Sequence, residues 1–278
     1  MIKIIADSSS DTFEFKNHDF SFVPLKVKTA TKEYVDNGTS EVLKMCEELS
    51  LTKDKTSTSC PNTYEWLESF SNDSDNLCIT ISANLSGSYN ACMLAKQIYE
   101  ESHNHKVIVV DSCSAGPELR LLIEKAKELI DKNLDVEEVE AVLEQYKYKT
   151  HTYFYTNSVN NLASNGRIPR LVSKAIAALK ISLIGQGSKE GKIKVIHETR
   201  NSKKAIDYIV EKLPECGYEN GKIRIDTCDN EKLESYLISK IKEIYPEADI
   251  DTKGCGILCS YYVEWHGIII SFEGKMKE

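Results

Sequence analysis

The chain has 278 residues, of which 41% are apolar, and it carries a formal net charge of −8. This composition allows one large or two medium domains with a real core, and it excludes a disordered chain. The acidic balance argues against nucleic-acid binding, which needs a basic face. No apolar run approaches the ~20 residues of a membrane span, and the N-terminus turns polar too soon for a signal peptide. We therefore expect a cytoplasmic protein that is not integral to a membrane.

Cysteine usage agrees with a reducing compartment. The nine cysteines are odd in number, scattered, and mostly within apolar segments, where cysteine acts as a small hydrophobe. The closest pair, Cys255 and Cys259, has no further ligands at metal-site spacing. No metal site is expected.

The first half of the chain alternates short apolar strands with helical patterns. Strands are predicted at 2–6, 21–27, 77–81, 107–110 and 152–156. Helices are predicted after residue 40, from Pro61, after a turn at 82–88, from Gly116-Pro117 and from Asp135. Such alternation is typical of a mostly parallel sheet with helices on its faces. It predicts an N-terminal α/β domain over residues 1–156.

The alternation restarts in the second half. Strands are predicted at 181–184, 192–197, 222–225, in an apolar stretch from 255, and at 267–272. Helices are predicted near 168–180, 202–213 and 230–244. The pattern predicts a second α/β domain over residues 157–278. Because no Pro-, Gly- or Ser-rich tether separates the halves, we expect them to pack closely with a cleft between them.

Polar turns follow several of the predicted elements, at 7–11, 56–61, 82–88 and 111–116. Ligands of open parallel sheets bind outside the carboxyl ends of the strands, so these turns are expected to converge. The strongest candidate is the turn within LCITISANLSGSYN, residues 77–90. Hydroxyl groups of Ser82, Ser86 and Ser88, with N–H groups at a helix start, can receive a carboxylate or phosphate. The alternative is an ordinary strand-to-helix connection capped by serines.

Several enzyme classes lack their essential parts. Asp7 opens an acidic turn, but an aspartyl-phosphate phosphatase needs a second carboxylate two residues later, where Ser9 stands. The GxSxG, GxGxxG and GxxxxGK[ST] motifs are absent. The sequence offers hydroxyl groups without an obvious base.

Taken together and in order, the turns resemble those of the DegV family of bacterial fatty-acid-binding proteins over essentially the whole chain. TSCP at 58–61 is similar to the family's TSQP turn, and SANLSGSY at 82–89 to its SSxLSGTY turn. Asp111-Ser112 with Gly116 is similar to its viDS segment. NGRI at 165–168 is similar to the GGRI turn, and Arg200 with 203–205 to the RxxKKA run that follows.

The resemblance implies a protein that holds one long-chain fatty acid in a lipid-binding cleft between its two domains. Thr58 and Ser86 take the places of the carboxylate-binding hydroxyls, with Ser59, Ser82, Asn84 and Gly87 in the same turns. A separate ATP-dependent fatty acid kinase phosphorylates the bound acid, and Arg167 matches a position used in that transfer. By this resemblance the chain is not itself an enzyme and needs no cofactor.

The last strand region departs from the family pattern. YVEWHG at 262–267 stands where the family has HTGPGA, so Tyr262 replaces its His and Glu264-Trp265-His266 replaces its GPG turn. The family's Lys-Pro is replaced by Ser182-Leu183. Either Tyr262 or His266 is a candidate for the lost imidazole. The larger side chains predict a shifted backbone or a narrower pocket.

Two main hypotheses result. The favoured one is a fatty-acid carrier that serves an acyl-phosphorylating kinase. The alternative is a diverged binder or sensor of another amphipathic carboxylate without a kinase partner. A hydrolase that uses Ser86 is a distant third.

Overall fold

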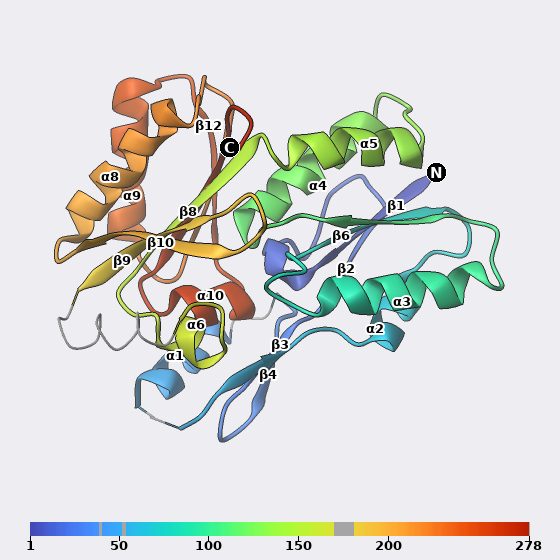
Figure 1. The fold of residues 1–278 in the computed structure, drawn as a ribbon, viewed down its shortest axis with the longest axis horizontal. Helices are drawn as coiled ribbons and strands as arrows, with labels where there is room; N and C mark the ends of the chain where they lie inside the picture. The colour runs from blue at the N-terminus through green and yellow to red at the C-terminus, as the bar shows by residue number, and fades with distance from the viewer. Residues whose placement is uncertain (39–40, 52–53, 170–180, 278) are drawn as a thin grey trace.

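The computed structural model describes residues 1–38, 41–51, 54–169 and 181–277. Figure 1 shows two α/β units side by side, one built mainly from the N-terminal half and the other from the C-terminal half. The predicted fold class is confirmed. The helix predicted near 168–180 lies outside the described residues from residue 170 onward. No helix in the described ranges is both long and apolar enough to cross a bilayer.

The first sheet has four parallel strands in the order β2-β1-β6-β7. They are β1 (Ile2–Asp7), β2 (Phe20–Val23), β6 (Asp75–Thr80) and β7 (Val107–Asp111). The helices beside them are η1 (Ser8–Ser10), α2 (Thr63–Ser69), α3 (Ser88–Glu100), α4 (Pro117–Ile130) and α5 (Val136–Tyr146). Successive β1 side chains face opposite sides: Ile4 and Ala6 pack with α4 and α5, and Ile5 packs with α2 and α3.

Local capping sets where these helices begin. Pro117 opens α4 and Asp135 caps α5 through a capping box, both as predicted. The prediction that Pro61 opens α2 is wrong. The Asn62 side chain accepts from the N–H groups of residues 64 and 65, and Glu65 reaches back to the Asn62 N–H, so this capping box starts the helix at Thr63.

The second sheet has six strands in the order β10-β9-β8-β13-β11-β12, and only β11 and β12 run parallel. They are β8 (Thr150–Thr156), β9 (Ser182–Gly187), β10 (Ile193–Thr199), β11 (Lys222–Thr227), β12 (Asp249–Gly254) and β13 (Ile268–Glu273). On one face α8 (Ser202–Glu215) and α9 (Glu231–Ile244) cover an apolar core that includes Ile225 and Ile270. On the other face, Phe154 and Ile269 pack with Cys259 and Val263.

Two predicted strands are placed differently. The strand at 152–156 belongs to the second sheet, where β8 is buried along its whole length and pairs with β9 and β13. We therefore propose that the domain boundary lies before β8 and not after residue 156. The apolar stretch from 255 forms a helix, α10 (Ile257–Val263), and not a strand. All but one of its residues are buried, so helical periodicity is not visible in the sequence.

A small third sheet joins the two units. It contains β3 (Lys26–Lys28), β4 (Glu33–Val35) and β5 (Ser57–Ser59) in the antiparallel order β4-β3-β5. The single strand predicted at 21–27 is thus divided between β2 and β3. Val27 and Met45, the latter on α1 (Val42–Leu51), pack against Ile257 and Tyr261 of α10. An element late in the chain is thereby seated against the N-terminal part.

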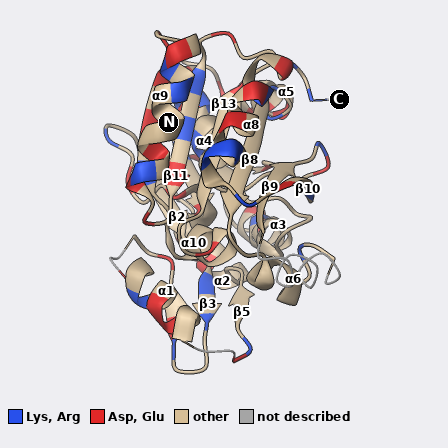
Figure 2. Ribbon diagram, turned by 90° about the vertical axis from the view of Figure 1, so that its left-hand side faces the viewer, with Lys and Arg blue, Asp and Glu red and all other residues tan. Residues whose placement is uncertain are grey.

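Charges of both signs are mixed on the outer helices. Figure 2 shows Lys and Arg interspersed with Asp and Glu along α1 and α9. Over the described part of this face, the basic residues form no continuous band of the kind that a phosphate backbone requires.

Candidate functional site

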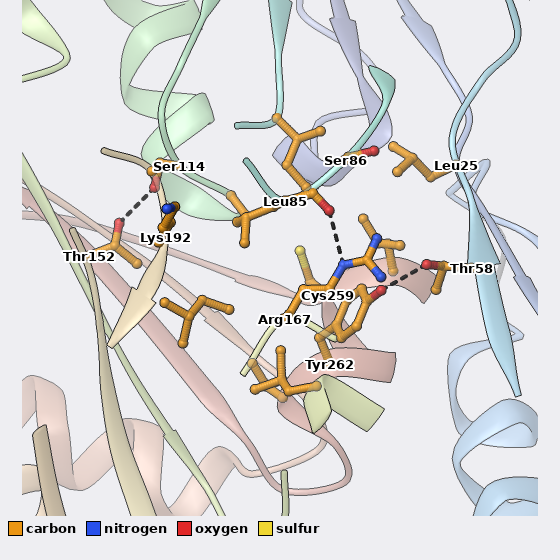
Figure 3. A pocket seen from close by; sticks show the side chains of 18 of the residues that line it. Leu25, Thr58, Leu85, Ser86, Ser114, Thr152, Arg167, Lys192, Cys259 and Tyr262 are labelled. Carbon is orange, nitrogen blue, oxygen red and sulfur yellow. Dashed lines mark hydrogen bonds between the residues drawn. The ribbon is translucent and has the colours of Figure 1, made fainter. Parts of the chain in front are cut away.

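A pocket of about 310 Å³ lies between the two units. Its wall is mainly apolar, with Leu25, Ile81 and Leu85 from the N-terminal part and Phe154, Leu258 and Ile269 from the C-terminal part. Figure 3 shows Leu25 and Leu85 at the edge of this space. Such a wall favours an apolar ligand or an apolar part of one.

Polar side chains gather at one end of this pocket, which we call the Arg167 end and which contains Thr58, Ser86, Arg167 and Tyr262 (Figure 3). The Tyr262 hydroxyl lies 2.7 Å from Thr58 Oγ1. Arg167 Nε donates to the Leu85 carbonyl oxygen at 3.0 Å, and its Cζ lies 5.9 Å from the centre of the Tyr262 ring. The end thus combines one fixed positive charge with three hydroxyl groups.

Arg167, which the family resemblance associates with transfer, is half-buried and lines the pocket. The local backbone explains its direction. The short helix α6 (Asn160–Ser164) is followed by the C-cap residue Asn165 and by Gly166, whose φ of 75° reverses the chain. The Arg167 N–H then donates to the Leu162 carbonyl at 2.8 Å, and the side chain enters the pocket beside Leu85.

Tyr262 also lines the pocket. Burial raises the pKa of its hydroxyl, while the hydrogen bond with Thr58 and the nearby Arg167 charge oppose the rise. The hydroxyl therefore stays protonated at neutral pH and can both donate and accept a hydrogen bond. A direct contact with a ligand carboxylate remains a prediction.

The serine hydroxyl groups of the 82–88 turn have different neighbours. Ser82 Oγ donates to the Gly191 carbonyl at 2.8 Å, and Ser88 Oγ donates to Asp7 Oδ2 at 2.7 Å. Of the three serines, Ser86 alone lines the pocket, so the expected receptor of three hydroxyls is reduced to one. The physical reason is the turn itself, which directs successive side chains to different neighbours.

Asn84 likewise points away from the pocket. Its Nδ2 donates to the Glu190 carbonyl at 2.7 Å, next to the Ser82 contact. Ser82 and Asn84 therefore clamp the hairpin between β9 and β10 onto the N-terminal unit. The predicted ligand roles of these two residues are corrected accordingly, while Ser59 and Gly87 do line the pocket.

His266 lies outside the pocket, which corrects its prediction as a replacement for the lost imidazole. It is exposed, and its Nδ1 lies 2.7 Å from the Asp229 carbonyl oxygen. Trp265 Nε1 donates to Asp229 Oδ2 at 2.8 Å. Because α10 ends at Val263 and the chain then reverses, the residues after it face the β11–α9 loop and not the ligand space.

The turn after α10 keeps glycine-like geometry without glycine. Glu264 has φ 59° and ψ 177°, and His266 has φ 69°, both in regions that side chains disfavour. The Glu264 carboxylate accepts from the Asn161 N–H at 3.2 Å, near the start of α6. This bond offsets part of the strain and links the turn to the segment that ends in Arg167.

Asp7 is a structural residue that connects the end of β1 to the segment around the 82–88 turn. It is fully buried, and Oδ2 accepts from the Ile81 N–H at 2.8 Å as well as from Ser88. Burial raises the pKa of its carboxyl, which hydrogen bonds from Ser9, Ile81 and Ser88 partly oppose. Its place at the end of the first strand was visible in the sequence, but its partners lie about 80 residues away.

Metal binding finds no support in the side-chain arrangement. Across the residues that the structure describes, no group of three or more His, Cys, Asp or Glu side chains is placed to hold a metal ion.

The fold and the pocket define a class: two-unit α/β proteins that enclose an apolar pocket with polar groups at one end. The family model described as "Uncharacterised protein, DegV family" matches residues 1–273. The chain belongs to the DegV family, as its turns predicted. A DegV domain-containing protein of Streptococcus pneumoniae strain R6 is 35% identical over 276 residues, covering 98% of each chain.

Two solved structures are similar over nearly the whole chain. A DegV family protein from Eubacterium eligens, loaded with heptadecanoic acid, has a TM-score of 0.95 and 36% identity, covering 99% of this chain and 100% of its own. The Fatty Acid Kinase (Fak) B3 protein of Streptococcus pneumoniae, loaded with linoleic acid, has a TM-score of 0.94 and 35% identity with the same coverage.

Proposed function

We propose that this protein binds a long-chain fatty acid with its hydrocarbon tail in the pocket and its carboxylate at the Arg167 end. The observation that carries the proposal is the pairing of a mainly apolar pocket with one cationic, hydroxyl-bearing end. The fatty acids bound to the two similar structures support it.

The Arg167 end suits a carboxylate on electrostatic grounds. A carboxylate that leaves water needs hydrogen bonds or a counter-charge to stay ionised. Thr58 and Ser86 supply hydroxyl donors, and the Arg167 guanidinium supplies a positive charge with several N–H groups. The same donors can also hold the more highly charged oxygens of an acyl phosphate.

We further propose that the protein presents the fatty acid to a separate kinase. That enzyme would transfer the γ-phosphoryl group of ATP to the bound carboxylate, giving an acyl phosphate and ADP. The similarity to a Fatty Acid Kinase B3 protein supports a carrier role. The described residues that line the pocket include no His, Asp or Glu, which gives no support to a hydrolase that uses Ser86.

Native mass spectrometry of the protein purified from bacteria tests the binding proposal. We expect a co-purified mass equal to one long-chain fatty acid, lost on delipidation and regained on adding the acid. Protein that stays free of lipid, and binds none when it is supplied, would overturn the proposal.

Phosphorylation assays with a bacterial fatty acid kinase test the second step. We expect ATP-dependent acyl phosphate with the loaded protein, and much less with Arg167→Ala at saturating fatty acid. Tight fatty-acid binding without any product would favour the alternative, a binder or sensor of an amphipathic carboxylate without a kinase partner. The replacement of the family's His by Tyr262 keeps that alternative open. The cytoplasmic location also stays a prediction.

A further inference from the structure

The pocket has a second polar region, distant from Arg167. We call it the Ser114 end, and it contains Ser114 and Thr152, which line the pocket while being only 4% and 6% exposed. Figure 3 shows their hydroxyl groups pointing toward each other on the side of the pocket opposite Thr58, and their oxygens are 3.4 Å apart. A hydrocarbon tail alone gains nothing from hydroxyl groups in this position.

A buried carboxylate organises these hydroxyls. Glu118 is 0% exposed and accepts hydrogen bonds from Ser114, Thr150 and Thr152, while Lys277 Nζ donates to it at 2.7 Å. Burial opposes ionisation, but the Lys277 charge and the hydroxyl bonds hold the pKa of Glu118 below its ordinary value. The charges of Glu118 and Lys277 offset each other. Lys192 also lines the pocket beside Ser114, as Figure 3 shows, and it is the one further charged side chain among the described lining residues on this side.

The free donors and acceptors of Ser114 and Thr152 determine which ligand groups can bind at the Ser114 end. Ser114 has one hydroxyl proton, which goes to Glu118, and its oxygen keeps acceptor capacity. Thr152 is also 2.7 Å from Ser271 Oγ and is occupied on both sides. Ser114 is therefore the available acceptor, and a matching ligand group must donate. An ionised carboxylate has no proton to donate, so it does not match the Ser114 oxygen.

The space in front of Ser114 is kept open by a glycine. A Cβ atom added to Gly187 would lie 4.0 Å from Ser114 Oγ and 3.8 Å from Thr152 Cβ, within the pocket that Gly187 lines. The backbone does not demand glycine here, because Gly187 is not among the residues with positive φ. Gly187 is the last residue of β9, and the absence of a Cβ there leaves room in the pocket beside Ser114.

We propose that the pocket accepts a hydroxylated long-chain fatty acid whose chain hydroxyl donates to Ser114 Oγ in the space left by Gly187. The proposal rests on the proposed function, because the carboxylate is taken to lie at the Arg167 end. It adds a second polar contact, and with it selection for the position of an oxygen along the acyl chain.

A panel of octadecanoic acid and its hydroxylated isomers, from mid-chain to the terminal carbon, tests the proposal by calorimetric titration of delipidated protein. A hydroxyl buried without a partner weakens binding by about tenfold or more. We expect most isomers to show this loss, and one position, facing Ser114, to bind at least as tightly as octadecanoic acid.

Three variants test whether the preference for the matched isomer arises at the Ser114 end. Ser114→Ala should reduce the ratio of affinities for the matched isomer and octadecanoic acid by about three- to tenfold. Gly187→Ala should reduce the same ratio by filling the space. Thr150→Val is the matched control, because Thr150 also donates to Glu118 but does not line the pocket, and it should keep the wild-type ratio.

The outcomes separate this proposal from the proposed function. Octadecanoic acid that binds while every hydroxylated isomer is weakened tenfold or more would overturn the Ser114 subsite alone. The subsite is also excluded if Ser114→Ala leaves the ratio of affinities for the matched isomer and octadecanoic acid unchanged. It is likewise excluded if Thr150→Val lowers that ratio as much as Ser114→Ala does. Failure of octadecanoic acid itself to bind would instead overturn the proposed function.

Discussion

Thr58 and Ser86 both lie at the Arg167 end, but one is in a strand and the other is in a loop. Thr58 is in β5, paired with Val27 of β3, and Ser86 is in the loop before α3. Ser86 Oγ accepts from the Ser88 N–H at 3.3 Å, which leaves its own proton free. The two hydroxyls can therefore serve one ligand group from two separately anchored segments.

Loss of these hydroxyls should weaken fatty-acid binding with little effect on folding. A hydrogen bond to a charged group contributes roughly 1.5–3 kcal/mol. We expect Ser86→Ala to lower affinity about tenfold or more, and the Thr58→Ala, Ser86→Ala double variant to lower it further, as measured by titration calorimetry.

The apo melting temperature should stay near that of the wild type. Ser239→Ala is a suitable control, because this hydroxyl on α9 bonds only a carbonyl of its own helix and lies outside the pocket. Undiminished affinity in the double variant would exclude the carboxylate site.

Tyr262 provides a second test at this scale. Tyr262→Phe removes the hydroxyl 2.7 Å from Thr58 and almost no volume. We expect a several-fold loss of affinity, because a neutral hydrogen bond contributes about 0.5–1.5 kcal/mol and here also orients Thr58. Equal affinities for the two proteins, over the same set of chain lengths, would show that Tyr262 acts only as an apolar wall.

At the scale of elements, the turn after α10 shows how the chain replaces lost glycines. Glu264 holds a conformation that is nearly restricted to glycine, and its carboxylate bonds the start of α6. The bond between the Glu264 carboxylate and the Asn161 N–H helps to hold this strained backbone. Substitution at position 264 can remove the bond with or without the backbone strain.

Two substitutions separate them. Glu264→Ala keeps the strain and removes the bond, whereas Glu264→Gly removes both. We expect the glycine variant to be more stable than the alanine variant by about 1–2 kcal/mol in urea unfolding. If the alanine variant is as stable as the glycine variant, or more stable, the turn must relax to another conformation.

Local patterns predicted the helices with caps and the strands with clear flanking turns, including β1, β7, α4 and α5. They failed for α10, whose burial on nearly all sides hides its period, and for β8, whose partners are set by pairing with β13 over 100 residues away. Of the residues proposed for the site, Thr58, Ser86 and Tyr262 line the pocket, and their contacts with a ligand stay predictions. Ser82, Asn84 and Ser88 do not, because their side-chain bonds are tertiary.

At the scale of the whole molecule, buried carboxylates connect the N-terminal part to α10. Asp11 Oδ1 accepts from the Gly256 N–H at 2.9 Å, and Asp36 Oδ1 accepts from the Ile257 N–H at 2.7 Å. Burial raises the pKa of Asp36 from 3.8 to about 7, against opposing hydrogen bonds from Ser8 and the start of α10. The helix that carries Tyr262 is therefore tied to Asp36, whose raised pKa lies near neutral pH.

The raised pKa of Asp36 makes the stability of the folded protein depend on pH. Because the folded pKa of Asp36 exceeds its unfolded value, the folded state binds more protons between pH 4 and 7, and this group makes the protein less stable as pH rises through that window. Asp36→Asn keeps an acceptor oxygen and cannot ionise.

We expect the free energy of unfolding of Asp36→Asn, measured by urea titration, to exceed that of the wild type at pH 8, and the gap to narrow toward pH 4. A gap that widens on acidification would reverse the assigned sign.

The clamp between the 82–84 turn and the β9–β10 hairpin depends on main-chain atoms of the hairpin. Ser82 and Asn84 bind the carbonyl oxygens of Gly191 and Glu190, so the side chains at 189 and 190, both exposed, take no part. Gly191 differs, because its φ is 71° and a Cβ there would lie 2.2 Å from Ser82 Oγ. Substitutions at 189 and 190 should therefore leave the clamp intact, whereas any side chain at Gly191 should break it.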